Sequence, residues 1–213
     1  MNKIQIVFQK ELLSSYRNRS ALGTSLMFGL VVLATISLSL GGARLSENLA
    51  AGLFWVMMFF TFIVTLERSF QEEYSAGTYT ALKIYHKSQD ILLGKLLFNI
   101  AYLLATSLVL SLVYLVLMDL TVAAPVTLIL TIILGAVGIS GAGTLLSSMA
   151  AAAANKNGLF AVLMLPVVLP LLLMLTTSTA AGLLGTDTAY LPAIALYDAI
   201  IIVAASILFD YIW

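Results

Sequence analysis

Long apolar runs alternate with short polar connections along this chain. A helix needs about 20 apolar residues to cross a hydrocarbon core of roughly 30 Å. Six runs are long enough, and they cover residues 21–42, 49–66, 91–118, 124–150, 158–183 and 191–210. The first run exceeds the roughly 7–15 residues of a signal-peptide core and no small-residue cleavage motif follows it, so we expect it to be retained. The pattern predicts an all-α membrane protein, a six-transmembrane-helix bundle forming one permease-sized domain over residues 1–213.

The N-terminal arm, residues 1–19, has a two-sided pattern. Its apolar side chains recur at helical spacing, at Ile4, Val7, Phe8, Leu12 and Tyr16. Most of its basic side chains lie off that stripe, which predicts an amphipathic helix along the inner leaflet, with its cations near anionic lipid headgroups. Two interpretations fit this arm: a simple basic anchor, and an elbow helix that helps to dock a cytosolic partner.

The connection 67–88 is the only long polar stretch between two apolar runs. We expect the second transmembrane helix to continue past the membrane and to end at Gly77, because glycine readily takes positive φ at a helix C-terminus. A short helix should follow from Thr78 to Tyr85, and Ser88 should cap the next helix, with Asp90 in its first turn. Tyr79, Leu82 and Tyr85 are three apart in that short helix and form one face. The face either folds back onto the membrane surface or fills a groove on a cytosolic partner.

Composition and charge agree with a membrane location. Hydrophobic residues make up 62% of the chain and charged residues 9%, whereas soluble domains carry about 25% charged residues. Arg44 is the one basic residue in the first, third and fifth connections. The arm and the other two connections hold the remaining nine: Lys3, Lys10, Arg17, Arg19, Arg68, Lys83, Lys87, Lys95 and Lys156. Basic connections stay in the cytoplasm, so we expect both termini to be cytoplasmic, with Asp187 in an external connection.

No residue pattern indicates catalysis. The chain lacks cysteine, has a single histidine, His86, and contains no G-x-x-x-x-G-K-[ST] run. We therefore expect no metal site, no cofactor bound by this chain and no nucleotide hydrolysis of its own. The formal net charge is zero, which gives no broad attraction to nucleic acid.

A few residues inside the apolar runs break the pattern. Asp198 is the one ionisable residue well inside a run, where a carboxylate costs roughly 2.5–3.5 kcal/mol near the bilayer centre. It should face the bundle interior, either as a polar contact between helices or on a translocation path. Pro166 and Pro170 lie four apart in the fifth run and predict a bend or a re-entrant shape. Gly138 and Ala142 have the small-xxx-small spacing of close helix contacts, within the chain or at a dimer seam.

A family resemblance lies in the segment that leaves the second helix. It contains Leu66-Glu67-Arg68-Ser69-Phe70, then Glu72-Glu73, then Gly77-Thr78. This segment resembles the CcmB family, the permease subunits of the ABC transporter for c-type cytochrome maturation, also called haem exporter protein B. The six-helix layout and the fifth run, with Leu165-Pro166-Val167-Val168-Leu169-Pro170-Leu171, agree with that family over the whole chain.

The resemblance implies the transmembrane half of an ABC complex in the bacterial cytoplasmic (inner) membrane. Its partners would be a cytosolic ABC ATPase subunit that binds ATP, a haem-handling membrane subunit, a periplasmic haem chaperone and a second permease copy. The implied function is haem export or ATP-driven release of the haem-loaded chaperone, with haem as the handled species. Two other functions stay open: a permease of another ABC exporter, for a lipid or drug, and a structural membrane subunit that transports nothing.

Within such a complex, residues 67–88 would be the cytoplasmic coupling segment, since no other predicted cytosolic connection is long enough. We expect Glu67 and Arg68, where the helix leaves the membrane, to transmit motion into the bundle. We expect ATPase contacts at Glu72, Glu73, Gly77, Thr78, Tyr79, Leu82 and Tyr85.

Overall fold

The computed structural model describes residues 3–17, 19–153, 158–186 and 190–213, and every regular element in these ranges is an α-helix. The helices are α1 (Lys3–Arg17), α2 (Arg19–Leu40), α3 (Glu47–Leu66), α4 (Arg68–Ser75), α5 (Tyr79–Tyr85), α6 (Ser88–Leu117), α7 (Pro125–Ala152), α8 (Leu159–Leu184) and α9 (Tyr190–Ile212). Lys156 and Asp187, used above to predict the topology, lie outside the described residues.

Six of these helices are long and apolar enough to cross a membrane, which confirms the predicted bundle. They are α2, α3 with its extension α4, α6, α7, α8 and α9. Large apolar side chains cover the outside of the bundle, among them Leu38, Val116, Val162 and Leu173. A soluble protein does not expose apolar surface on this scale, so the hydrocarbon of a bilayer is the medium that fits this surface.

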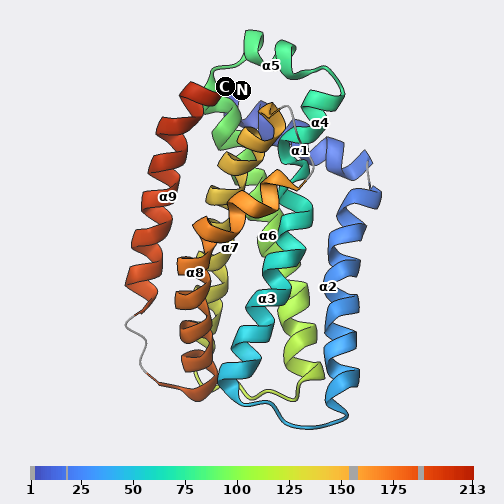
Figure 1. Cartoon of the computed structure of the whole chain (residues 1–213), viewed down its shortest axis with the longest axis vertical. Coiled ribbons are helices and arrows are strands. Elements are labelled where there is room, and N and C mark those ends of the chain that lie inside the picture. The colour runs from blue at the N-terminus through green and yellow to red at the C-terminus, as the bar shows by residue number, and fades with distance from the viewer. Residues whose placement is uncertain (1–2, 18, 154–157, 187–189) are drawn as a thin grey trace.

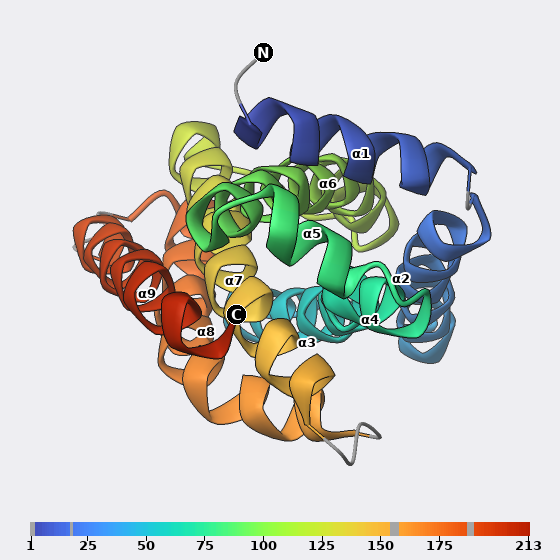
Figure 2. The ribbon, with the colours of Figure 1, turned by 90° about the horizontal axis from the view of Figure 1, so that it is seen from above.

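The spanning helices run side by side along the long axis, and the remaining elements gather at one end of the bundle (Figure 1). This end, called the α5 end below, carries α1, α4, α5 and the C-terminus. Seen from above, α1 lies across the bundle beside α6 rather than along it (Figure 2). The opposite end has only short connections, and there Arg44 forms an exposed ion pair with Asp119, 3.4 Å apart.

Helix α7 occupies the centre of the bundle, and its small residues let its neighbours approach closely. It packs against α3, α4, α6, α8 and α9. A Cβ at Gly135 would overlap Trp55 of α3, and one at Gly143 would lie 2.5 Å from Leu66. A Cβ at Gly138 would overlap Asp198 of α9. The small residues of this helix thus make contacts within the chain.

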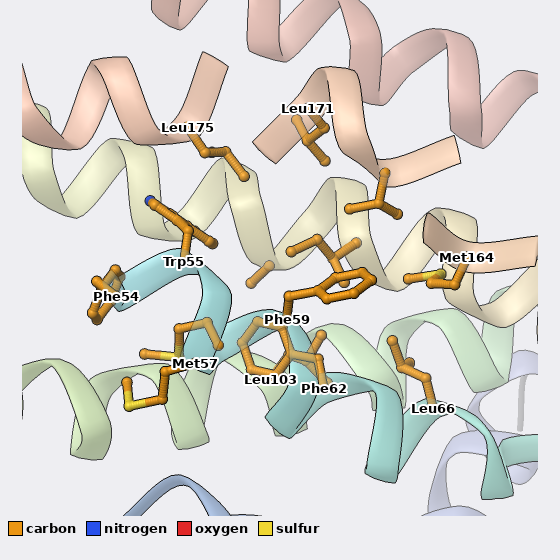
Figure 3. Close-up of a cluster of buried hydrophobic side chains, with 14 of the residues drawn as sticks. Phe54, Trp55, Met57, Phe59, Phe62, Leu66, Leu103, Met164, Leu171 and Leu175 are labelled. Atoms are coloured by element: carbon orange, nitrogen blue, oxygen red, sulfur yellow. The ribbon is translucent and has the colours of Figure 1, made fainter. Parts of the chain in front are cut away.

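The main core lies between α3, α6, α7 and α8, and side chains of α3 dominate it (Figure 3). Phe59, Phe62 and Leu66 are buried along one face of α3. Two buried polar side chains of this core, away from the α5 end, form hydrogen bonds. The Trp55 indole Nε1 donates to Thr179 Oγ1 at 2.7 Å, and the Tyr114 hydroxyl donates to the Ala50 carbonyl at 2.8 Å. In hydrocarbon each unsatisfied polar group costs several kcal/mol, so these bonds fix how the helices meet.

Pro166 and Pro170 both lie inside α8, which stays one continuous helix and is not re-entrant. The helix changes direction in its first half, so its beginning runs obliquely over α3 before it descends beside α7 (Figure 1). Prolines leave carbonyls of the preceding turn without their helical donor. The Tyr197 hydroxyl of α9 donates to the Val167 carbonyl in this region. This hydrogen bond fastens the bent part of α8 to α9.

Candidate functional site

The coupling segment predicted from the sequence is α4 and α5 with their connections. Helix α3 continues into α4 after a turn at Glu67, and α4 ends before Gly77, whose φ is +69°. Helix α5 begins at Tyr79, one residue later than expected, and Thr78 holds its N-cap position. Ser88 does not cap α6, because Lys87 holds that position and the Ser88 hydroxyl donates to Asp210 instead. Asp90 lies in the first turn of α6, as predicted.

An aromatic cluster fastens α4 and α5 to the end of α9. Phe70 is fully buried, and its ring centroid lies 5.7 Å from those of Phe209 and Trp213. Tyr79 of α5 meets the Trp213 ring edge-on at 4.6 Å, and its hydroxyl donates to the Trp213 carbonyl at 3.3 Å. Tyr74 lies against Tyr79 with 4.3 Å between centroids. Aromatic pairs contribute about 0.5–1.5 kcal/mol each beyond their burial, so the cluster holds the segment firmly.

A cluster of four charges, three buried and Lys10 half-buried, fastens α4 to α1 and α6 on the other side. The Lys95 ammonium lies 2.9 Å from a Glu11 oxygen and 2.8 Å from a Glu73 oxygen. Lys10 also pairs with both carboxylates, at 3.0 Å from Glu11. Lys95 is 1% exposed and Glu73 3% exposed. Breaking a buried pair by removing one partner costs about 3–5 kcal/mol, because the other charge is left uncompensated.

The ionised forms in this cluster stabilise one another. Burial alone would raise the pKa of the Glu11 carboxyl, but Lys95 and Lys10 outweigh burial and lower it from its usual 4.5. Burial alone would lower the pKa of Lys10, but Glu11 and Glu73 outweigh it and raise that pKa from its usual 10.5. Both groups are therefore ionised over a wide range around neutral pH, as an ion-pair cluster requires.

Hydrogen bonds extend this cluster to the central helix. The Lys95 ammonium also donates to the Ser69 carbonyl. The Asn99 amide donates to Thr144 Oγ1 of α7 at 2.9 Å and to the Ser69 hydroxyl at 3.2 Å. Ser147 of α7 accepts from the Phe70 backbone N–H at 3.3 Å. The start of α4 is thus tied by side chains to both α6 and α7.

Helix α1 reaches its place because α6 has no side chain where the two cross. An ideal Cβ at Gly94 would lie 2.6 Å from Val7 Cβ and 3.1 Å from the Ile4 carbonyl. The arm is helical, as its periodicity predicted. One face of it, with Val7 and Glu11, is buried against the protein, whereas its periodicity alone predicts an apolar stripe against the membrane.

The predicted ATPase contacts divide into inward and outward groups. Tyr79 and Leu82 are half-buried against the aromatic cluster, while Tyr85 is 74% exposed, so the three do not form one exposed face. Ile84, also 74% exposed, stands beside Tyr85 on the outer surface of α5. It was missed because its position breaks the three-residue spacing of the predicted face.

The predicted acidic contacts also divide, because neighbouring residues of a helix point in different directions. Glu72 is exposed, as a partner contact requires, whereas Glu73 is buried in the charge cluster and does not belong to an outer rim. Gly77 and Thr78 are exposed in the turn before α5.

Glu67 and Arg68 lie where α3 turns into α4. The Glu67 carbonyl accepts from the Ser147 hydroxyl at 3.4 Å, which joins this turn to α7. Arg68 is exposed and lines a small polar cavity of about 50 Å³ together with Thr65, Ser69 and Glu72. Both residues thus lie at the joint between the coupling segment and the spanning helices.

The cluster residues Lys10, Glu11 and Lys95 were not recognised from the sequence. Glu11 falls within the apolar stripe of the arm, and Lys95 follows Leu92, Leu93 and Gly94 inside an apolar run. A charge that interrupts an apolar pattern is a usable signal of a buried ion pair, but a lysine so near the start of a run is equally typical of a cytoplasmic connection. Among the described residues, no group of His, Cys, Asp and Glu is arranged to hold a metal ion.

Asp198 faces the interior, as predicted, but as an isolated group. It is 3% exposed and lies against Gly138 and Leu171. Neither carboxyl oxygen has a hydrogen-bond partner among the described residues. Within the described residues, Asp198 therefore makes no hydrogen bond to another helix.

Six helices long and apolar enough to span a membrane, with a charged and aromatic assembly at one end, define a multi-pass membrane protein. The chain belongs to the CcmB family, since the family model described as CcmB protein matches residues 2–209. Members are permease subunits of the ABC transporter of c-type cytochrome biogenesis, which places the chain in a transport system of the inner membrane with other subunits and gives it a non-enzymatic role. No curated protein matches the chain.

Proposed function

We propose that this chain is the transmembrane half of an ABC complex whose ATPase is a separate cytosolic subunit. The ATPase binds the α5 end, which is cytoplasmic and carries both termini. The complex acts in haem export or in ATP-driven release of a haem-loaded periplasmic chaperone, together with a haem-handling membrane subunit and a second permease copy. Haem is the handled species.

The attachment of α4 and α5 to the bundle is the observation that supports this proposal. A cytosolic ATPase drives a membrane subunit only through an element that is both exposed to it and firmly joined to the spanning helices. Phe70 and Glu73 join α4 to α9, α6 and α1, while Ile84 and Tyr85 stand exposed on α5. Exposed apolar and aromatic anchors of this kind fill pockets on partners and contribute much of the binding energy.

Recovery of the ATPase tests the contact. In the double variant Ile84→Ser with Tyr85→Ser, each lost anchor should cost about 2 kcal/mol, and even one anchor corresponds to roughly 30-fold weaker binding. We expect the purified membrane subunit to lose its ATPase in mild detergent while it still inserts, because both side chains lie outside the aromatic cluster.

A matched control is Leu38→Ser with Val116→Ser, two exposed apolar residues in the last turns of α2 and α6, which both end at the opposite end of the bundle (Figure 1). This variant should recover the ATPase normally. Undiminished recovery with the α5 variant would exclude α5 as the contact. Loss in both variants would point to general damage rather than to a docking surface.

A further inference from the structure

An apolar groove runs below the second half of α1, along α6. Its volume is about 430 Å³, within the roughly 300–1,000 Å³ of small-ligand sites. Its walls are Leu12, Leu13, Ser15 and Tyr16 of α1 and Phe98, Ala101, Tyr102 and Ala105 of α6. The groove opens to the outside of the bundle, where hydrocarbon surrounds the chain.

Small and aromatic residues of α6 shape this groove. Ala101 and Ala105 are one turn apart and exposed, so their short side chains leave the space open. Phe98 stacks on Tyr102 at 6.3 Å between centroids and forms a flat wall. The Tyr102 hydroxyl lies 2.5 Å from Ser25 Oγ, which ties α2 to α6 and limits the groove on that side.

A hollow with cationic side chains adjoins the groove across Leu13, which lines both. Its other walls are Lys10, Ser14 and Arg17. Lys10 is engaged by Glu11 and Glu73, whereas Arg17 is exposed at the end of α1. The apolar groove and the exposed cation Arg17 thus lie next to each other at the surface of the bilayer.

We propose that this composite site binds one anionic glycerophospholipid, with an acyl chain along Phe98, Ala101 and Ala105 and the phosphate at Arg17 and Ser14. The order of the surfaces matches the order of chemical groups in a phospholipid: apolar at membrane depth, hydroxyl and guanidinium at headgroup level. A protein partner docked in the groove would not require a cation and a hydroxyl beside the apolar walls. The inference goes beyond the proposed function and does not depend on the ATPase.

Lipid retention by the purified chain tests the site. Native mass spectrometry is carried out in detergent supplemented with phosphatidylglycerol or with phosphatidylcholine of the same acyl chains. We expect one phosphatidylglycerol to be retained in preference to phosphatidylcholine. Arg17→Gln should reduce that preference about 5-fold, since one cation near the surface contributes about 1 kcal/mol toward an anionic lipid. Ala101→Phe with Ala105→Phe should reduce binding of both lipids about tenfold by filling the groove.

Two controls make the result specific. Lys87→Gln removes an exposed cation beside α5, and Ala195→Phe enlarges an exposed alanine on α9; both should bind lipid normally. Equal retention in wild type and the groove variants, or equal loss in the controls, would overturn the proposal. So would a disulfide-linked dimer formed by Ala105→Cys in this cysteine-free chain, because a second copy would then occupy the groove.

Discussion

Two ionisable residues look alike in the sequence and differ entirely in the structure. Lys95 and Asp198 each interrupt an apolar run. Lys95 meets two carboxylates and a backbone carbonyl, whereas neither oxygen of Asp198 has a partner among the described residues. Lys95 is therefore part of a cluster that holds three helices together. The Asp198 carboxyl instead fills the space beside Gly138, which only a residue without a side chain leaves open.

The Gly138–Asp198 contact gives a prediction about this place. A Cβ in Gly138→Ala would overlap the Asp198 carboxyl and lie 2.7 Å from a Leu171 methyl. Overpacking of this kind costs about 1–3 kcal/mol. In an Asp198→Ala background much of that cost should disappear, so unfolding in detergent should show a coupling of about 1 kcal/mol between the two sites.

Gly52→Ala is the control, because an ideal Cβ at Gly52 meets nothing within 4 Å. That variant should be neutral or slightly stabilising, since alanine favours helix over glycine by about 1 kcal/mol. Strictly additive effects of Gly138→Ala and Asp198→Ala would show that the two side chains do not compete for space.

At the scale of elements, the arm α1 illustrates what periodicity reveals and what it leaves open. The apolar spacing from Ile4 to Tyr16 correctly predicted a helix. Helical spacing does not distinguish an apolar face that meets lipid from one that meets protein, and α1 uses both. Gly94 of α6 and the ion pair between Glu11 and Lys95 decide which side is buried. Gly94 and Lys95 belong to α6, so the pattern of the arm alone does not contain them.

The attachment of α1 should depend on pH with a defined sign. The pKa of Glu11 is lowered by Lys95 and Lys10, so its contribution is complete above about pH 4.5 and is lost as the pH falls through the lowered value. The pKa of Lys10 is raised by Glu11 and Glu73, so its contribution is complete below about pH 10.5 and is lost above. The other charges facing Glu11 and Lys10 are Glu73 and Lys95.

A nitroxide on Gln9→Cys measures this attachment, because Gln9 is exposed and the chain has no other cysteine. Its mobility should stay low from about pH 5 to pH 10 and rise outside that range. Glu11→Gln should remove the acid transition and leave the label mobile already at pH 7. An unchanged spectrum in acid for the wild-type arm would contradict the role of Glu11.

For the whole molecule, apolar run length predicted the six spans, since crossing hydrocarbon imposes a length that a sequence displays directly. The family was equally accessible, because residues 66–78 carry its motif. The central position of α7 could not be predicted, because residues 124–150 have the same apolar pattern as the other spans. Glycine spacing predicts a close helix contact but does not show which helix makes it. The charge cluster was missed for the same reason, since it assembles from residues 10, 11, 73 and 95.

Orientation is the prediction that belongs to this scale. With the α5 end in the cytoplasm, a membrane-impermeant maleimide should label Asp119→Cys in intact cells, and Tyr85→Cys only after permeabilisation. Both positions are exposed, at opposite ends of the bundle. Leu169→Cys, an exposed position near the middle of the spanning helix α8, should resist labelling throughout. The reverse pattern at Asp119 and Tyr85 would invert the topology.

The central place of α7 has a consequence for biogenesis. Trp55 and Leu66 of α3 pack against Gly135 and Gly143, about 80 residues further along the chain. At a synthesis rate of about 5–20 residues per second, the ribosome takes about 4–16 seconds to make that interval. During this delay the inserted early helices have no permanent neighbour on that face. The nascent permease is thus expected to need an insertase or intramembrane chaperone to shield it until α7 arrives.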